Sequence, residues 1–74
     1  MTLDQIQPGN DCRIIDLFSR DKLCKRLLSM GFFPGLELRV VRNAPLNDPM
    51  EIKIGTSFLS LRRHEARYIE VEPA

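Results

Sequence analysis

The chain is poor in the residues that most often carry chemistry. Its 74 residues include no tryptophan, one histidine and two cysteines, and aromatic residues make up only 7%. Cys12 and Cys24 are too far apart for a Cys-x-x-Cys motif, so we expect two reduced, partly buried thiols. His64 has no neighbouring ligands with metal spacing, so a surface or turn position is predicted for it. The sequence therefore predicts no metal site.

Motifs of catalysis are missing as well. The sequence contains neither a Gly-x-Ser-x-Gly nucleophile motif nor a glycine-rich phosphate loop. Its glycines stand singly, where turn or cap geometry explains them. A core of this size supplies only about 3–5 kcal/mol of net stability, which leaves little margin for a deep polar active site. We expect no catalytic residue, no cofactor and no enzymatic activity.

Neither sign of charge dominates. Eleven Lys and Arg face ten Asp and Glu, which gives a formal net charge of +1. Domains that bind nucleic acid are usually far more basic, so we do not expect nucleic acid to be a partner. No apolar run approaches the roughly 18 residues of a spanning helix, and residues 1–5 lack the character of a signal peptide. We expect residues 1–74 to form one cytoplasmic domain.

Most of the chain alternates apolar and polar residues with the period of two that is typical of strands. Tight-turn residues separate these segments, and Gly55-Thr56 predicts one such turn. The predicted strands span residues 12–18, 36–41, 50–54, 57–61 and 68–72, with a single helical turn at 62–66. So few residues cannot form two covered sheets, so we predict one bent sheet that closes into a small barrel and leaves no exposed edge.

One helix is predicted between the first two strands. Ser19 and Asp21 are candidate N-caps. At about 100° per residue, the apolar residues share one arc and the opposite, basic face is expected in solvent. The apolar arc holds Leu23, Cys24, Leu27, Leu28 and Met30, and the basic face holds Lys22, Lys25, Arg26 and Ser29.

The helix is expected to end in a glycine cap followed at once by a tight turn. Gly31 suits the left-handed cap position, and Phe32 follows where a contact back onto the last turn is common. Phe33-Pro34-Gly35-Leu36 has the residues of a type II turn, which leads into the second strand. The predicted fold is mainly β, a small SH3-like barrel of about five strands with one inserted α-helix.

Four segments, with the spacing that separates them along the chain, resemble the FeoA family, the small ferrous iron transport A proteins of bacteria. They are Leu27–Gly35, Val40–Pro49, Leu59–Arg62 and Tyr68–Val71. The resemblance covers roughly Leu3 to Val71. One departure is Met30, where the family more often has leucine, a change that conserves volume.

The resemblance implies a cytoplasmic SH3-like domain without catalysis. Its implied partner is the membrane ferrous iron permease with a cytoplasmic GTP-binding domain, which it would bind and regulate from the inner face of the membrane. Weak self-association is a further expectation. The alternatives are a nucleic-acid-binding barrel that uses Arg62, Arg63 and Arg67, or the SH3-like regulatory module of an iron-dependent repressor system.

A partner-binding patch is predicted at residues that the barrel need not bury. Phe33 follows another phenylalanine, and Pro45 and Leu46 lie in a proline-flanked loop that can present a side chain at low entropic cost. Arg39 and Arg42 are the expected polar rim. In the alternative interpretation, Phe33 packs under the helix cap and Leu46 closes one end of the barrel.

Overall fold

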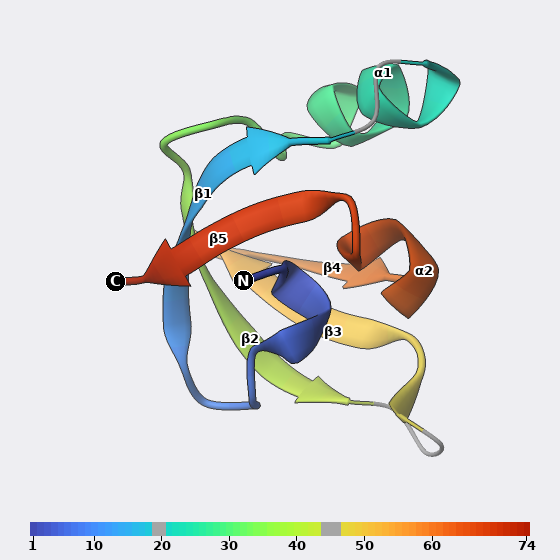
Figure 1. The fold of residues 1–74 in the computed structure, drawn as a ribbon. Helices are drawn as coiled ribbons and strands as arrows, with labels where there is room; N and C mark the ends of the chain where they lie inside the picture. Colours follow the sequence, from blue (N-terminus) through green and yellow to red (C-terminus); the bar gives the residue numbers. More distant parts are fainter. Residues whose placement is uncertain (19–20, 44–46) are drawn as a thin grey trace.

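The computed structural model describes residues 1–18, 21–43 and 47–74. Its five strands form one antiparallel sheet in the order β4-β3-β2-β1-β5, and the sheet is strongly bent (Figure 1). The strands are β1 (Asp11–Leu17), β2 (Glu37–Asn43), β3 (Met50–Ile54), β4 (Ser57–Leu61) and β5 (Ile69–Pro73). The predicted fold class and all five predicted strands are confirmed; β3 and β4 have the predicted bounds, and the bounds of the other three differ by one or two residues.

Helices occupy the ends of the barrel. Helix α1 (Lys22–Ser29) is inserted between β1 and β2, and the single turn α2 (Arg63–Ala66) joins β4 to β5 (Figure 1). A short 3-10 helix, η1 (Leu3–Gln5), was not predicted because three residues are too few to show a period. Across the described residues, no helix has both the length and the apolar character that crossing a membrane requires.

Two bulges help a single sheet to curve. The β1–β5 register shifts between Ile14 and Asp16, and the β2–β3 register shifts between Val40 and Arg42. A bulge bends its strand and increases its twist, so the sheet wraps around one core. The outer edge of β5 is covered by the N-terminal segment, where the Val71 N–H donates to the Met1 carbonyl oxygen at 2.9 Å. The wrapping is not complete, because β4 pairs only with β3 among the described strands. The prediction that closure leaves no exposed edge is therefore wrong.

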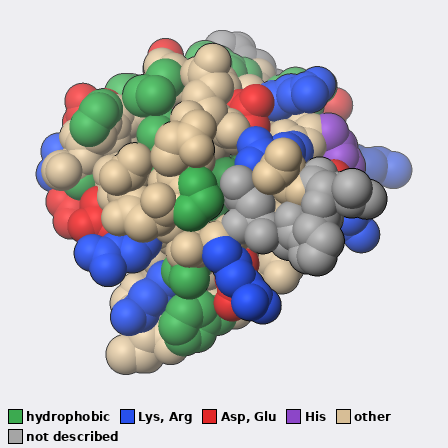
Figure 2. All heavy atoms as spheres, turned by 90° about the horizontal axis from the view of Figure 1, so that it is seen from below, with side chains coloured by type: hydrophobic (Ala, Val, Ile, Leu, Met, Phe, Trp, Pro, Cys, Tyr) green, Lys and Arg blue, Asp and Glu red, His purple; other side chains and the backbone are tan. Residues whose placement is uncertain are grey.

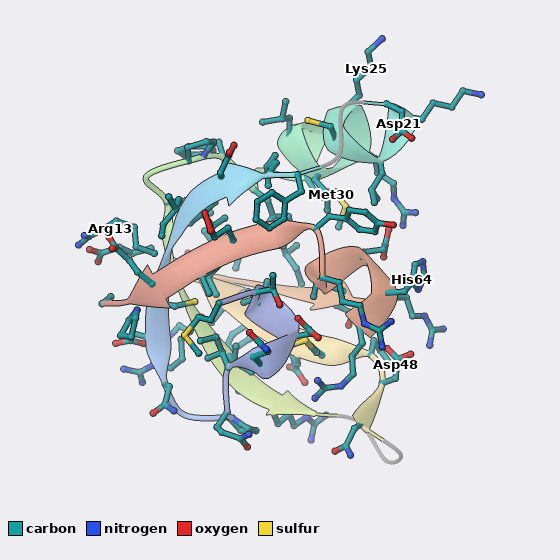
Figure 3. The ribbon with its side chains drawn as sticks, viewed as in Figure 1. Arg13, Asp21, Lys25, Met30, Asp48 and His64 are labelled. Carbon is teal, nitrogen blue, oxygen red and sulfur yellow. The ribbon has the colours of Figure 1, made fainter. Side chains whose placement is uncertain are left out.

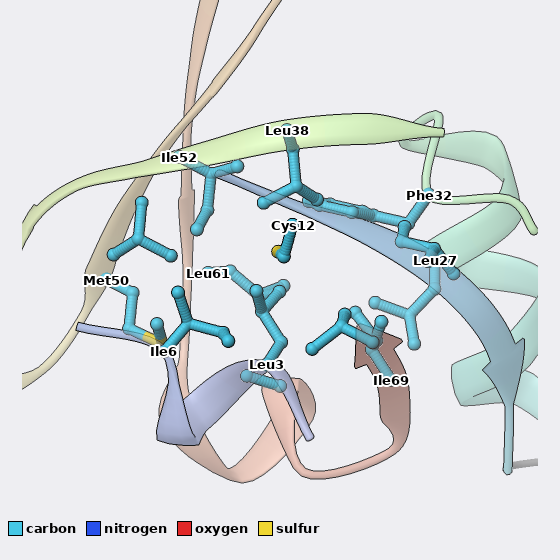
Figure 4. Packing of buried hydrophobic residues seen from close by; sticks show 14 residues of the cluster. Leu3, Ile6, Cys12, Leu27, Phe32, Leu38, Met50, Ile52, Leu61 and Ile69 are labelled. Carbon is cyan, nitrogen blue, oxygen red and sulfur yellow. The ribbon is translucent and has the colours of Figure 1, made fainter. Parts of the chain in front are cut away.

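One hydrophobic core fills the space inside the sheet (Figure 4). Every element contributes to it, from Leu3 of η1 to Ile69 and Val71 of β5. Its largest fully buried side chains include Phe32, Leu3, Ile14, Leu27, Met50, Ile52 and Leu61. The inward residues of the strands are the ones that the period of two selects.

The predicted ends of α1 are confirmed. The Asp21 carboxylate accepts from the Leu23 N–H at 3.1 Å. After the helix, Gly31 has φ 97° and the Phe32 N–H donates to the Leu27 carbonyl oxygen at 3.0 Å, as in a Schellman cap. Gly35 has φ 94°, and the Leu36 N–H donates to the Phe33 carbonyl oxygen at 3.1 Å, which closes the type II turn.

Candidate functional site

Exposed hydrophobic side chains concentrate where α1 meets the sheet. They come from β1 and the residue after it, from α1, from the turn behind α1 and from the residue before β5. Phe18 and Tyr68 are neighbours, because the Phe18 N–H donates to the Tyr68 carbonyl oxygen at 2.8 Å. We call this the α1-end surface, and its members are Ile15, Phe18, Leu28, Phe33 and Tyr68, each 44–51% exposed.

The barrel covers only the middle of the apolar arc of α1. Leu27 is fully buried, whereas Leu23, Cys24 and Met30 are half-buried. Met30 lies on the side of α1 that faces the sheet (Figure 3), and Leu28 at the border of the arc is 46% exposed. The arc was predicted correctly, but its edges remain available for contact with another molecule.

The basic face of α1 is exposed to solvent, and one of its residues also forms an ion pair with α2. Lys22 and Lys25 are exposed, and Lys25 points away from the barrel (Figure 3). Arg26 is exposed as well, as predicted, and its Nη1 also lies 2.9 Å from Oε2 of Glu65 in α2. Glu65 is only 3% exposed, and its Oε1 also accepts from the Arg62 N–H at 3.3 Å. Sequence patterns missed this link because it joins two helices that lie far apart in the chain.

Phe33 is exposed to solvent. Its side chain is 48% exposed on the type II turn, and the neighbouring Phe32 is the residue buried beneath the cap. The alternative in which Phe33 packs under the helix cap is therefore wrong. Pro45 and Leu46 lie outside the described residues.

The two arginines of the predicted rim are held on the sheet by carboxylates. Arg39 Nε donates to Asp11 Oδ1 at 2.7 Å, and Arg42 Nε donates to Glu51 Oε2 at 2.7 Å. The hydrogen bond from Arg39 holds the pKa of the Asp11 carboxyl below its usual value. Phe33 precedes β2 and Arg42 lies near its other end, and the five strand steps from residue 37 to 42 span about 17 Å. The structure thus does not bring Phe33 and Arg42 together.

The sulfur and imidazole groups are scattered. Both cysteines are free, with Cys12 buried and Cys24 half-buried. Burial, with a smaller effect from Asp11, raises the pKa of the Cys12 thiol to about 11. His64 is exposed on α2 (Figure 3). Within residues 1–18, 21–43 and 47–74, no three side chains of His, Cys, Asp or Glu are grouped so as to hold a metal ion.

The arginines of the α2 region contact other segments of the chain, although the side chains of Arg62 and Arg67 remain 59% and 70% exposed. Arg63 Nη1 donates to the Asp4 carbonyl oxygen at 2.7 Å, and the Arg63 N–H donates to Asp48 Oδ1 at 3.1 Å. Arg67 pairs with Asp4 at 3.8 Å and Arg62 with Asp48 at 4.0 Å. On the face seen from below, basic side chains are interspersed with acidic and apolar ones (Figure 2). These arginines tie α2 to η1 and to the segment before β3.

The chain is similar in sequence to iron transport proteins. A family model described as FeoA domain matches residues 1–73. The chain is 40% identical to an Fe(2+) transport protein A/Fe(2+) transporter FeoB fusion protein of Porphyromonas gingivalis, over 97% of this chain but only 8% of that protein. It is 34% identical to a putative Fe(2+) transport protein A of Campylobacter jejuni, over 96% of each.

Solved structures share the architecture. The iron(II) transport protein A of Clostridium thermocellum superposes with a TM-score of 0.94 at 43% identity, over all of this chain and 46% of that one. The FeoA of Stenotrophomonas maltophilia, solved with zinc and described as a prokaryotic SH3 domain protein, gives a TM-score of 0.83 at 26% identity, over 97% of this chain and 89% of that one. The SH3-like fold predicted from the sequence is confirmed.

Proposed function

Because the chain belongs to the FeoA family of ferrous iron transport accessory proteins, we propose that it binds and regulates the membrane ferrous iron permease through a protein–protein interface. The observation that carries this proposal is the Porphyromonas gingivalis relative, in which a matching segment and an Fe(2+) transporter form one polypeptide. Joining two parts in one chain raises their effective concentration toward each other, an arrangement that favours parts that interact.

The α1-end surface is the proposed contact. Exposed apolar side chains that gather on one side of a small domain mark interaction sites. Three of its five members, Phe18, Phe33 and Tyr68, are aromatic, and aromatic residues are enriched among the side chains that dominate binding energy. The exposed Lys22 and Lys25 supply a polar rim beside it.

Pro45 and Leu46 remain a second proposed contact region at the opposite end of β2, with Arg39 and Arg42 as its rim. Both arginines already have carboxylate partners, so binding there would require them to share or exchange those partners. Exposed ion pairs contribute little in water, so this exchange is not costly.

Binding to the purified cytoplasmic GTP-binding domain of the permease tests the proposal. Leu28→Asp and Phe33→Asp should each weaken binding about tenfold or more, because each places a charge within an apolar contact. Gln7→Asp is the charge control, since Gln7 is exposed and follows η1, away from this surface. Unfolding midpoints confirm that each variant is folded.

Several outcomes would decide between the two regions. If Leu46→Asp weakens binding and the two α1-end variants do not, the loop is the contact and the α1-end surface is not. If the wild-type chain does not bind the GTP-binding domain or the intact permease, and does not alter GTP hydrolysis, direct regulation is refuted.

The nucleic-acid alternative is not favoured. Its basic patch would consist of Arg62, Arg63 and Arg67. The carboxylates of Asp48 and Asp4 lie 4.0 Å from Arg62 and 3.8 Å from Arg67, and the Arg63 guanidinium is hydrogen-bonded to the Asp4 carbonyl oxygen, so the patch is not uniformly basic. Strong retention on heparin that falls steeply with salt would support it, since phosphate binding depends on counterion release.

A further inference from the structure

Within residues 1–18, 21–43 and 47–74, no strand pairs with the outer edge of β4. Its five residues, Ser57–Leu61, carry no charge and no proline, and all five pair with β3 in a regular register without a bulge. Natural sheets usually guard an edge strand with lysine, proline or a bulge. Phe58 on this strand is 57% exposed, the highest value among the large hydrophobic side chains that the structure describes.

The other edge of the same sheet is guarded. β5 carries Glu70, Glu72 and Pro73, and Met1 and Thr2 cover its outer side. The two edges of the sheet therefore differ: the edge at β5 is covered, and the edge at β4 is not.

The pairing of β4 with β3 determines which backbone groups point outward. A two-residue turn, Gly55-Thr56, makes Ile54 and Ser57 a hydrogen-bonded pair. Hydrogen-bonded pairs then recur at every second position, at Leu59 and Leu61. The N–H and C=O groups of Phe58 and Ser60 therefore face away from β3, on the side where no described strand pairs with β4.

We propose that a second copy of this chain occupies this edge, with the two β4 strands antiparallel about a two-fold axis at Leu59. In this register Phe58 of one copy lies opposite Ser60 of the other. Each outward N–H then meets an outward C=O, and the two sheets join into one continuous sheet. The exposed Phe58 side chain gains a neighbour across the interface.

Charge complementarity selects this register. On the outer face Lys53 lies opposite Phe58, with its Nζ 5.7 Å from the ring centroid, and Glu51 lies opposite Ser60. When the strands pair about Leu59, each row across the interface holds Lys53 and Phe58 of one copy, followed by Ser60 and Glu51 of the other. The lysine and the glutamate at the two ends of a row are three strand spacings apart, about 14 Å. Pairing Phe58 with Phe58 would align two lysines, and pairing Ser60 with Ser60 would align two glutamates.

The association is weak and reversible. Pairing five residues buries less surface than a standard interface of about 1,600 Å². The preference for register is also modest, because Glu51 already binds Arg42. We expect a dissociation constant between about 10 μM and about 1 mM.

Nitrogen-15 NMR and sedimentation of the whole chain, from about 10 μM to about 2 mM, test the proposal. At high concentration the Phe58 and Ser60 amides should shift and become protected from hydrogen exchange. The Leu59 and Leu61 amides, already bonded to β3, should change far less. This alternation within one strand distinguishes strand pairing from non-specific association.

Ser60→Lys should raise the dissociation constant about tenfold or more, because a lysine on an exposed edge strand disfavours the pairing of that edge with another strand. Gln7→Lys adds the same charge at an exposed residue away from β4 and should associate like the wild type. The proposal is overturned if the chain stays monomeric throughout, if Ser60→Lys associates normally, or if the concentration-dependent shifts fall on Leu28 and Phe33.

Discussion

At the scale of single residues, Cys12 and Cys24 share a chemistry but not an environment. The thiolate is the reactive form, and burial with Asp11 nearby raises the pKa of Cys12 to about 11. We expect one thiol, that of the half-buried Cys24, to react rapidly with Ellman's reagent at neutral pH. Cys12 should react only after denaturant is added. Cys24→Ser should remove the fast phase, and two thiols reacting at equal rates would contradict the structure.

The Asp11–Arg39 pair makes a specific prediction about acid. The pKa of Asp11 is lowered in the folded state, chiefly by its hydrogen bond from Arg39. The pair therefore stabilises the fold above the ordinary value of 3.8, and this contribution disappears as the pH falls through the lower folded value. Urea midpoints of the wild type and Asp11→Asn should differ near neutral pH and converge in acid. Arg39→Gln should mimic Asp11→Asn, and a difference that grows in acid would reverse the assignment.

At the scale of elements, the cap of α1 depends on the backbone of one residue. Gly31 has φ 97°, and an added Cβ would meet no atom within 4 Å, so the penalty for a side chain is conformational rather than steric. Gly31→Ala should lower the free energy of unfolding by about 1–2 kcal/mol. Gly31→Asn should cost less, because asparagine tolerates the left-handed region. Equal urea midpoints for the two variants would show that the cap is not under this constraint.

The Arg26–Glu65 link joins α1 to α2 across the end of the barrel. Arg26→Ala would leave the nearly buried Glu65 carboxylate without its counterion, which should destabilise the fold by about 1–3 kcal/mol. Adding Glu65→Gln removes the buried charge, so the double variant should be more stable than the sum of the single effects predicts. Strict additivity in denaturant titrations would mean that the two side chains are not coupled.

At the scale of the whole molecule, the core extends to the third residue of the chain. Leu3 of η1 is fully buried, and Leu→Ala at such a site lowers stability by about 2–5 kcal/mol. A domain of this size has only about 3–5 kcal/mol in total, so Leu3→Ala should populate the unfolded state measurably at 25 °C. Leu28→Ala, at an exposed leucine, should leave the circular dichroism melting curve almost unchanged. Similar losses for both would contradict the burial of the N-terminal segment.

The features that could be predicted from the sequence are those that depend on residues close together in the chain. The period of two identified the strands, and Gly31, Phe32 and Gly35 identified the cap and turn, because each depends on neighbours in the chain. The bulges at Ile15 and Val41 and the Arg26–Glu65 pair depend on segments far apart in sequence. For the same reason the predicted patch joined Phe33 with Arg42, although the extended strand between them separates the two.

The position of the two chain termini affects how the domain could be joined to another protein. The Met1 carbonyl oxygen accepts from Val71, and the Ala74 N–H donates to the Asp11 carbonyl oxygen at 3.3 Å, so both termini lie near the end of β5 and away from α1 (Figure 1). A tether attached at either terminus would leave α1 unobstructed. It would also hold the domain at about millimolar local concentration near its target, so that even a feeble contact would be occupied most of the time.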